Sequence, residues 1–152
     1  MMAAASAGGT RFEGIMIELY AWATTNGLRA TVAFAESGLP HRVCPVDLGK
    51  KAQKSPAYLA INPAGQIPAM VDRSTDPPHV LTQSGAIVLY ACTRGHCLIP
   101  ADPANYFLAM QWFMQAATDI GGASAALQQV AVVAPEKVAR TIALFEQRLL
   151  RY

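Results

Sequence analysis

Hydrophobic and polar residues alternate at positions 15–20, "IMIELY", where the first regular pattern of the chain begins. Alternation with a period of two, carried by β-forming residues, predicts a strand there. The apolar residues that follow recur at spacings of four, three and four: Leu28, Val32, Ala35 and Leu39. This spacing predicts a helix with one apolar face. Gly38 and Pro40 are expected to end it, because glycine is favoured just after a helix and proline cannot continue one.

Proline marks one edge of the expected sheet. Residues 41–48, "HRVCPVDL", predict a second strand. Pro45 has no N–H group to donate to a neighbouring strand, so this strand is expected at the sheet edge. Strand, helix and strand within about 30 residues form a β-α-β unit. The polar, proline-punctuated residues 49–65 leave room for one short irregular helix.

Two short strands and a helix follow. Residues 66–72, "QIPAMVD", predict a third strand, and residues 79–82, "HVLT", predict a fourth after the turn "DPP". Residues 84–95, "SGAIVLYACTRG", predict a helix that ends at its glycine. The expected order is therefore β-α-β-α-β-β-α, an α/β domain over residues 15–95.

Helical signals dominate the remainder of the chain. Residues 96–103 contain two prolines and no periodicity, which predicts a linker. Residues 104–152 carry an apolar stripe at helical spacing, in which "DIGG" (119–122) predicts a kink or a stop. A last helix is expected over residues 135–152, with proline in its first turn. Broad apolar faces on both helices require a cover, which could be the first domain, another chain or further helices.

Composition narrows the class of protein. Hydrophobic residues make up 53% of the 152 positions and charged residues 14%, unlike a disordered chain. The net charge is only +2 with no block of like charges, so neither a nucleic acid nor a membrane surface is expected as a partner. Residues 1–14 lack the basic start and apolar core of a signal peptide. We therefore expect a flexible leader and a cytoplasmic protein.

The cysteines give no sign of a disulfide framework or a metal site. Cys44, Cys92 and Cys97 are odd in number and lack C-x-x-C spacing, which predicts reduced thiols. His96 lies beside Cys97 in "CTRGHC", but a zinc site normally needs four ligands, so no metal is expected. Cys44 and Cys92 are interpreted as core residues, and Cys97 as a linker thiol.

Three motifs resemble one enzyme family: "ATTNG" (23–27), "NPAGQIPAM" (62–70) and "QSGAIVLY" (83–90). With the order of elements, residues 15–95 resemble the thioredoxin-like, glutathione-binding domain of cytosolic glutathione S-transferases. Residues 104–152 resemble the start of that family's all-helical domain. The likeness is strongest to bacterial Nu-class and fungal Ure-like members, which carry Thr-x-Asn after the first strand. The resemblance implies a thioredoxin-like domain, a partial all-α domain and a homodimer.

The resemblance also implies a site for glutathione. In the family, the proline that matches Pro68 is cis, which would turn the Ile67 backbone outward to pair with the cysteinyl part of the peptide. Gln83 and Ser84 stand at a helix N-terminus, which favours an anion, so they would hold the γ-glutamyl group. A simple N-cap role for Ser84 is compatible with this, and the family more often has Glu in place of Gln83. Gln53 matches a position that reaches the glycyl carboxylate. Three lysines add positive potential or are simply solvated: Lys50, Lys51 and Lys54.

Activation of the glutathione thiol is expected to depend on Thr24 and Asn26. A free thiol has a pKa of about 8.5, and the thiolate is the nucleophile. A hydrogen bond to a charged acceptor contributes roughly 1.5–3 kcal/mol and a pKa unit is about 1.4 kcal/mol, so one donor could lower the thiol pKa by one or two units. Both residues could instead only cap the helix. Tyr20 is the rival donor, because many relatives use a tyrosine on the first strand.

Two classes of function follow from the resemblance. The first is a glutathione transferase that attacks a hydrophobic electrophile, or reduces disulfides and peroxides with two glutathione molecules as co-substrates. The second is a non-catalytic binding or regulatory module, supported by Gln83 and by the short helical part. None of the cysteines matches a cysteine nucleophile of the family, which disfavours a cysteine mechanism.

Overall fold

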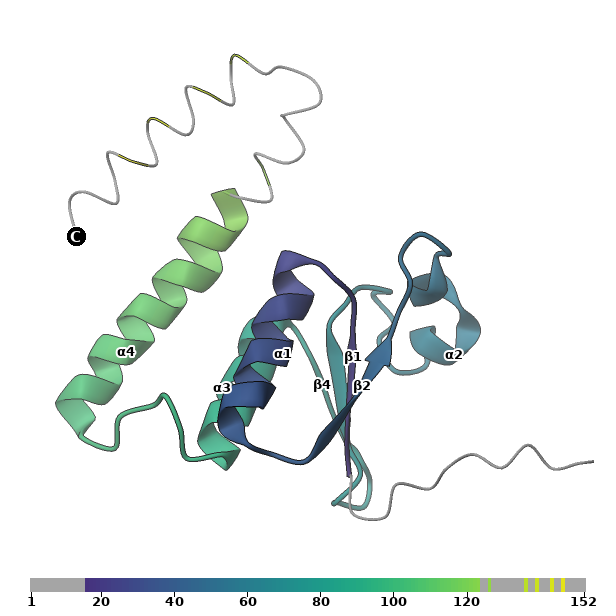
Figure 1. The fold of residues 1–152 in the computed structure, drawn as a ribbon, viewed down its shortest axis with the longest axis horizontal. Coiled ribbons are helices and arrows are strands. Elements are labelled where there is room, and N and C mark those ends of the chain that lie inside the picture. Colours follow the sequence, from purple (N-terminus) through teal and green to yellow (C-terminus); the bar gives the residue numbers. More distant parts are fainter. Residues whose placement is uncertain are drawn as a thin grey trace, which may run out of the picture. The chain divides into compact units, whose positions relative to one another are not determined.

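The computed structural model describes residues 16–123 and, beyond them, five single helical residues: Ala126, Glu136, Ala139, Ala143 and Glu146. The chain divides into two compact units, the first ending at Ile99 and the second beginning at Pro100. Figure 1 draws the described residues of both units as ribbons.

The first unit is a four-stranded mixed sheet with helices on both faces (Figure 1). Its strand order is β2-β1-β3-β4, with β1 parallel to β2 and the other pairs antiparallel. This arrangement confirms the predicted thioredoxin-like fold. The elements are β1 (Ile17–Ala21), α1 (Thr25–Ser37), β2 (His41–Pro45), the short 3₁₀ turn η1 (Ala52–Lys54), α2 (Pro56–Leu59), β3 (Ala69–Asp72), β4 (His79–Thr82) and α3 (Ser84–Arg94).

The two faces of β1 serve two different layers, because successive side chains of a strand point in opposite directions. One face carries Ile17, Leu19 and Ala21, which pack into the core with α1 and α3. The other carries Glu18 and Tyr20, on the side where Tyr58 of α2 packs. Figure 1 accordingly shows α1 and α3 side by side on one face of the sheet and α2 on the other.

The buried face of α1 differs from the predicted one. The sequence pointed to the stripe through Leu28 and Val32, but these side chains are 56% and 57% exposed. The helix instead buries Ala30, Ala33 and Phe34, which also recur at helical spacing. Phe34 is fully buried, and two small alanines beside it let the helix approach the sheet closely. An apolar stripe therefore existed on each side of α1, and the stripe that includes the aromatic ring faces the core.

Several predicted boundaries change for reasons that proline explains. The third strand was expected to begin at Gln66 and to include Pro68, but β3 begins at Ala69, directly after the proline. A residue without an N–H group cannot join the strand ladder. β2 likewise stops at Pro45 rather than continuing to residue 48, and it lies at the sheet edge as predicted. Residues 49–65 contain two short helical turns, η1 and α2, instead of one.

The second unit begins with α4 (Pro103–Gln115), whose first turn is capped by Asp102: the Asn105 N–H donates to its carboxylate at 3.0 Å. The helix continues through a π-helical segment, η2 (Ala116–Ile120), into residues 121–123. The "DIGG" segment is therefore no stop. The predicted helix over 135–152 lies outside the described residues, apart from single helical positions. Within the described part of the chain, no helix combines the length and hydropathy that crossing a bilayer requires.

The buried Asp72 carboxylate of β3 connects α3 to the sheet through a hydrogen bond. The Tyr90 hydroxyl donates to Asp72, which is only 2% exposed, and the Ser74 N–H donates to the same side chain at 2.8 Å. Burial alone would raise the pKa of Asp72, but the hydrogen bonds from Tyr90 and Ser74 outweigh it and lower the pKa. For the phenol, burial and the neighbouring carboxylate raise the pKa of Tyr90 to about 12. The pair thus stabilises the ionised acid and the neutral phenol.

Tyr90→Phe is expected to lower the free energy of unfolding by about 1.5–3 kcal/mol, because it removes a hydrogen bond to a buried charge. A raised folded-state pKa stabilises the fold below pH 10.0 and loses that effect as the pH rises through about 12. Denaturant titrations should therefore show wild-type stability falling over this interval and the variant falling less. Tyr106→Phe, at an exposed position of α4, is the matched control. Equal stability of the two variants would contradict the assignment.

Candidate functional site

Four loops lie together at one end of the strands, and the strand register explains this. Tyr20 pairs with Ala69, and Ala69 pairs with Thr82, so the end of β1, the start of β3 and the end of β4 lie in one row. Ala21 pairs with Pro45, which adds the end of β2. The chain segments that continue from these positions carry all of the predicted site residues: Thr24 and Asn26, Gln53, Ile67 and Pro68, and Gln83 and Ser84.

Thr24 caps α1, and its hydroxyl donates to no group within the described residues. Its Oγ1 accepts a hydrogen bond from the Gly27 N–H at 3.1 Å, and its backbone is extended, as an N-cap requires. Accepting uses a lone pair, so the hydroxyl hydrogen remains available. Position 27 requires glycine, because a Cβ added there would lie 2.1 Å from the Trp22 carbonyl oxygen. The turn from Trp22 to Gly27 therefore places the Thr24 hydroxyl at the start of the helix.

The amide of Asn26 has a defined orientation. The Arg29 guanidinium donates to Asn26 Oδ1 at 3.2 Å. With the oxygen occupied by this cation, the group that remains is the Nδ2 amide, which can only donate. The first turn of α1 thus offers two donors, a hydroxyl and an amide.

Tyr20, the rival donor, is already engaged elsewhere. Its hydroxyl donates to Glu18 Oε2 at 3.0 Å, on the α2 side of the sheet. Burial and the Glu18 carboxylate raise the pKa of Tyr20. Glu18 is further bound by Arg73 at 2.8 Å and by Arg42. This arrangement disfavours Tyr20 as the group that activates a thiol.

The Ile67–Pro68 peptide bond is cis, as predicted, and Pro68 is buried. Two buried side chains hold the segment that precedes it. The Tyr58 hydroxyl donates to the Gln66 carbonyl oxygen at 2.6 Å, and Asn62 Nδ2 donates to the same oxygen at 2.7 Å. Both side chains are 5% exposed.

Gln53 lies against this segment and carries an unsatisfied amide oxygen. Its Oε1 is buried with no hydrogen-bond partner within the described residues. A Cβ on Gly65 would lie 3.0 Å from the Gln53 carbonyl oxygen and 2.6 Å from Lys54 Nζ, so the two loops approach each other closely here. Gly65 also adopts a positive φ of 58°, which glycine tolerates best. The loops of η1 and of residues 62–68 therefore form one wall.

Gln83 and Ser84 form the start of α3, with one correction to the expected cap. Ser84 is the first residue of the helix, and Gln83 is the N-cap, with no side-chain capping bond. Gln83 has a φ of 74°, a conformation that costs a non-glycine residue of order 1–3 kcal/mol and is found mostly at functional sites. Within the part of the chain that the structure describes, the helix therefore begins with backbone N–H groups and a Ser84 hydroxyl that have no partner, an arrangement suited to an anion.

Comparison with known proteins decides the family. The family model described as "Glutathione S-transferase, N-terminal domain" matches residues 16–92, more than half of the 152-residue chain. The chain belongs to the glutathione S-transferase family. It is 37% identical over 100 residues to the disulfide-bond oxidoreductase YfcG of Escherichia coli, covering 64% of this chain and 46% of that protein. It is 42% identical over 105 residues to the glutathione S-transferase-like protein tpcF of Aspergillus fumigatus, covering 66% and 45%.

Solved glutathione transferases share the fold. One from Burkholderia graminis, with two glutathione molecules bound per subunit, superposes with a TM-score of 0.72 at 27% identity, covering 92% of this chain and 64% of that one. A family member from Pseudomonas fluorescens, also with two glutathione molecules bound, gives 0.68 at 28% identity, covering 80% and 53%. The chain spans about half the length of the curated relatives named above.

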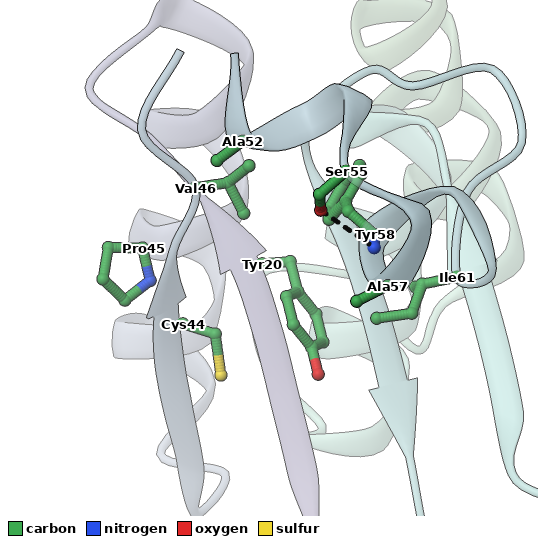
Figure 2. A pocket seen from close by; sticks show the side chains of 9 residues that line it. All are labelled: Tyr20, Cys44, Pro45, Val46, Ala52, Ser55, Ala57, Tyr58 and Ile61. Carbon is green, nitrogen blue, oxygen red and sulfur yellow. Dashed lines mark hydrogen bonds between the residues drawn. The ribbon is translucent and has the colours of Figure 1, made fainter. Parts of the chain in front are cut away.

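A cavity on the α2 side of this glutathione S-transferase domain was not expected from the sequence. It measures about 270 Å³ and is lined by Tyr20, Cys44, Pro45, Val46, Ala52, Ser55, Ala57, Tyr58 and Ile61 (Figure 2). Cys44 lies in its wall rather than in the core, and burial raises the pKa of its thiol. Cys92 is buried as predicted. Within the described residues, no cluster of three or more His, Cys, Asp or Glu side chains could hold a metal.

Sequence reasoning missed the residues that hold the site in place. Three residues that the sequence did not single out donate to a predicted site residue or its neighbour. Tyr58 and Asn62 donate to Gln66, and Arg29 donates to Asn26. Asn62 stood inside the quoted motif, and its position before proline was the available signal. The roles of Tyr58 and Arg29 depend on contacts that the linear pattern does not reveal.

Proposed function

We propose that this chain binds glutathione at the edge where the four loops meet and activates its thiol with Thr24 and Asn26. The observation that carries the proposal is the combination, at one sheet edge, of a cis-Pro68 loop, an anion-binding helix start at Ser84 and uncommitted donors at the start of α1. Glutathione bound in solved relatives supports the choice of ligand.

Each part of the tripeptide has a chemical counterpart at this edge. The Ile67 backbone would pair with the cysteinyl residue in the manner of an added strand. The N–H groups and hydroxyl at Ser84 would bind the γ-glutamyl carboxylate, and the Gln83 side chain would contact the same group. Gln53 would donate from Nε2 to the glycyl carboxylate, while its Oε1, buried without a partner in the described part of the chain, can only accept a hydrogen bond. Lys54 lies beside Gly65 in the same wall and adds positive charge.

The reaction is proposed to start from a thiolate stabilised by the Thr24 hydroxyl and the Asn26 amide. Reduction of a disulfide R–S–S–R is favoured, since YfcG is named a disulfide-bond oxidoreductase. The thiolate attacks one sulfur, breaks the S–S bond and releases R–S⁻, leaving a mixed disulfide with glutathione. A second glutathione thiolate then attacks the mixed disulfide, giving glutathione disulfide and the second R–S⁻. Conjugation to a hydrophobic electrophile is the alternative use of the same thiolate.

Parallel assays separate these reactions. The purified protein with glutathione would be given a small aliphatic disulfide, a hydroperoxide, or an aromatic chloride as electrophile. Faster turnover of the disulfide than of the aromatic chloride is expected. Conjugation without disulfide reduction would replace the oxidoreductase assignment by a transferase assignment.

A non-catalytic binding or regulatory module is the second candidate. It is favoured by Gln83, an amide where the family more often has a carboxylate to grip the ligand ammonium. Glutathione binding without turnover of any of the three substrate types would support it. We further propose that residues 15–95 form the glutathione-binding domain, that 96–103 link it to the helical part, and that the protein is a homodimer, which sedimentation analysis would test.

A further inference from the structure

We infer that Tyr58 and Asn62 are positioning residues that aim the Ile67 N–H at the glutathione backbone. This inference rests on the proposed function, because it concerns how that site is pre-organised. Neither side chain is proposed to touch the ligand. Both act through one atom, the carbonyl oxygen of Gln66, which accepts their hydrogen bonds at 2.6 and 2.7 Å.

The geometry of the peptide unit transmits this contact to the ligand side. The Gln66 carbonyl and the Ile67 N–H belong to the same peptide group, which is planar. This peptide is not among the cis bonds of the described residues, so its C=O and N–H point in opposite directions. Two buried donors on the oxygen therefore fix the direction of the N–H on the other side. That N–H is the group proposed to pair with the cysteinyl carbonyl.

Both donors are themselves held in place. Asn62 accepts the Ala64 N–H at 3.2 Å through Oδ1, which leaves Nδ2 for the Gln66 carbonyl. Tyr58 belongs to α2, where its N–H donates to Ser55 Oγ at 3.3 Å (Figure 2). Its carbonyl accepts from the Asn62 N–H at 2.9 Å, so the two donors are also joined to each other. The segment before Pro68 is thus attached to α2 rather than left as a loose loop.

The Tyr58 ring packs in a buried cluster on one side and borders a cavity on the other. The ring borders the cavity of about 270 Å³ drawn in Figure 2 and meets the Tyr20 ring edge-on at a centroid distance of 6.1 Å. Beside this packing, the hydroxyl bond to the Gln66 carbonyl is the polar contact that fixes the direction of the ring. Removing the hydroxyl should therefore loosen the ring and leave the Gln66 carbonyl held by Asn62 alone.

Tyr58→Phe tests the inference, with Tyr20→Phe as the matched control. Both substitutions delete one hydroxyl from a tyrosine that lines the same cavity, but the Tyr20 hydroxyl is bound to Glu18 instead of Gln66. Calorimetric titration with glutathione, at a temperature where each variant is folded, should show the Kd rising about tenfold for Tyr58→Phe and unchanged for Tyr20→Phe. The pKa of the bound thiol, read from thiolate ultraviolet absorbance, should not change, because its donors lie on α1.

Three outcomes would overturn the inference: wild-type affinity in Tyr58→Phe, equal losses in both variants, or a shifted thiol pKa in Tyr58→Phe. Equal losses of glutathione affinity would mean that removing any hydroxyl from the cavity wall weakens binding, whichever group that hydroxyl contacts. A wild-type protein that binds no glutathione would contradict the proposed function itself. The wild-type titration therefore separates failure of the site from failure of its positioning.

Discussion

Replacing Gly27 by alanine is expected to lower the free energy of unfolding by about 3 kcal/mol and to abolish glutathione binding. The added Cβ would lie 2.1 Å from the Trp22 carbonyl oxygen and 3.2 Å from the Trp22 backbone nitrogen. These are main-chain atoms, so no side chain can rotate away and the turn itself must move. Overpacking of this kind typically costs 1–3 kcal/mol. The movement would displace Thr24, since the Gly27 N–H donates to its hydroxyl oxygen.

Gly122→Ala is the matched control for this substitution. Gly122 is helical, and a Cβ added there meets nothing within 4 Å. Alanine is favoured over glycine in a helix by roughly 0.5–1 kcal/mol, so this variant should be as stable as the wild type or slightly more so. Thermal unfolding and glutathione titration of both variants give the comparison. Normal stability and binding in Gly27→Ala would show that the turn is not rigid and that its placement of Thr24 does not matter.

Substitutions of Thr24 are expected to separate its capping role from its proposed role in activating the thiol. Thr24→Asp keeps an oxygen that can accept the Gly27 N–H, so α1 should remain capped. It has no hydrogen to donate when ionised and adds a negative charge beside the sulfur. The pKa of the bound glutathione thiol should therefore rise by roughly one to two units, with about a 10- to 100-fold loss of turnover at neutral pH.

Two further variants complete the comparison. Thr24→Ser retains both the acceptor and the donor and should resemble the wild type. Thr24→Ala loses both, so its unfolding free energy should fall by about 1 kcal/mol as well. Turnover and thiol pKa in Thr24→Asp equal to those of the wild type would mean that Thr24 only caps the helix. Asn26, or a group outside the described residues, would then have to stabilise the thiolate.

The order of elements could be read from the sequence because each has a strong local signal. The alternation in β1, the terminating glycine of α1 and the short strand β4 all lie where the pattern placed them. Pro45 and Pro68 were also correct signals, since one stops an edge strand and the other precedes β3. The segments that carry the predicted site residues lie at one end of the sheet, and the strand register accounts for that convergence.

The errors arose where long-range packing decides between two local possibilities. Helix α1 has apolar residues on two sides, and only contact with the sheet selects Phe34 over Leu28. The donors onto the Gln66 carbonyl come from four and eight residues earlier in the chain, a geometry that no periodicity encodes. The positive φ of Gln83 is likewise a backbone feature, and glutamine gives no hint of it. Such features depend on tertiary structure rather than on propensity.

Calorimetric titration of the purified chain with glutathione, beside Ser84→Ala, tests the central claim most directly. The expected result is saturable binding by the wild type and at least a tenfold weaker Kd in the variant. The reason is that the Ser84 hydroxyl at the start of α3 is proposed to bind the γ-glutamyl carboxylate. No binding by a folded, monodisperse wild-type protein, or equal binding by both proteins, would contradict a glutathione site at this edge of the sheet.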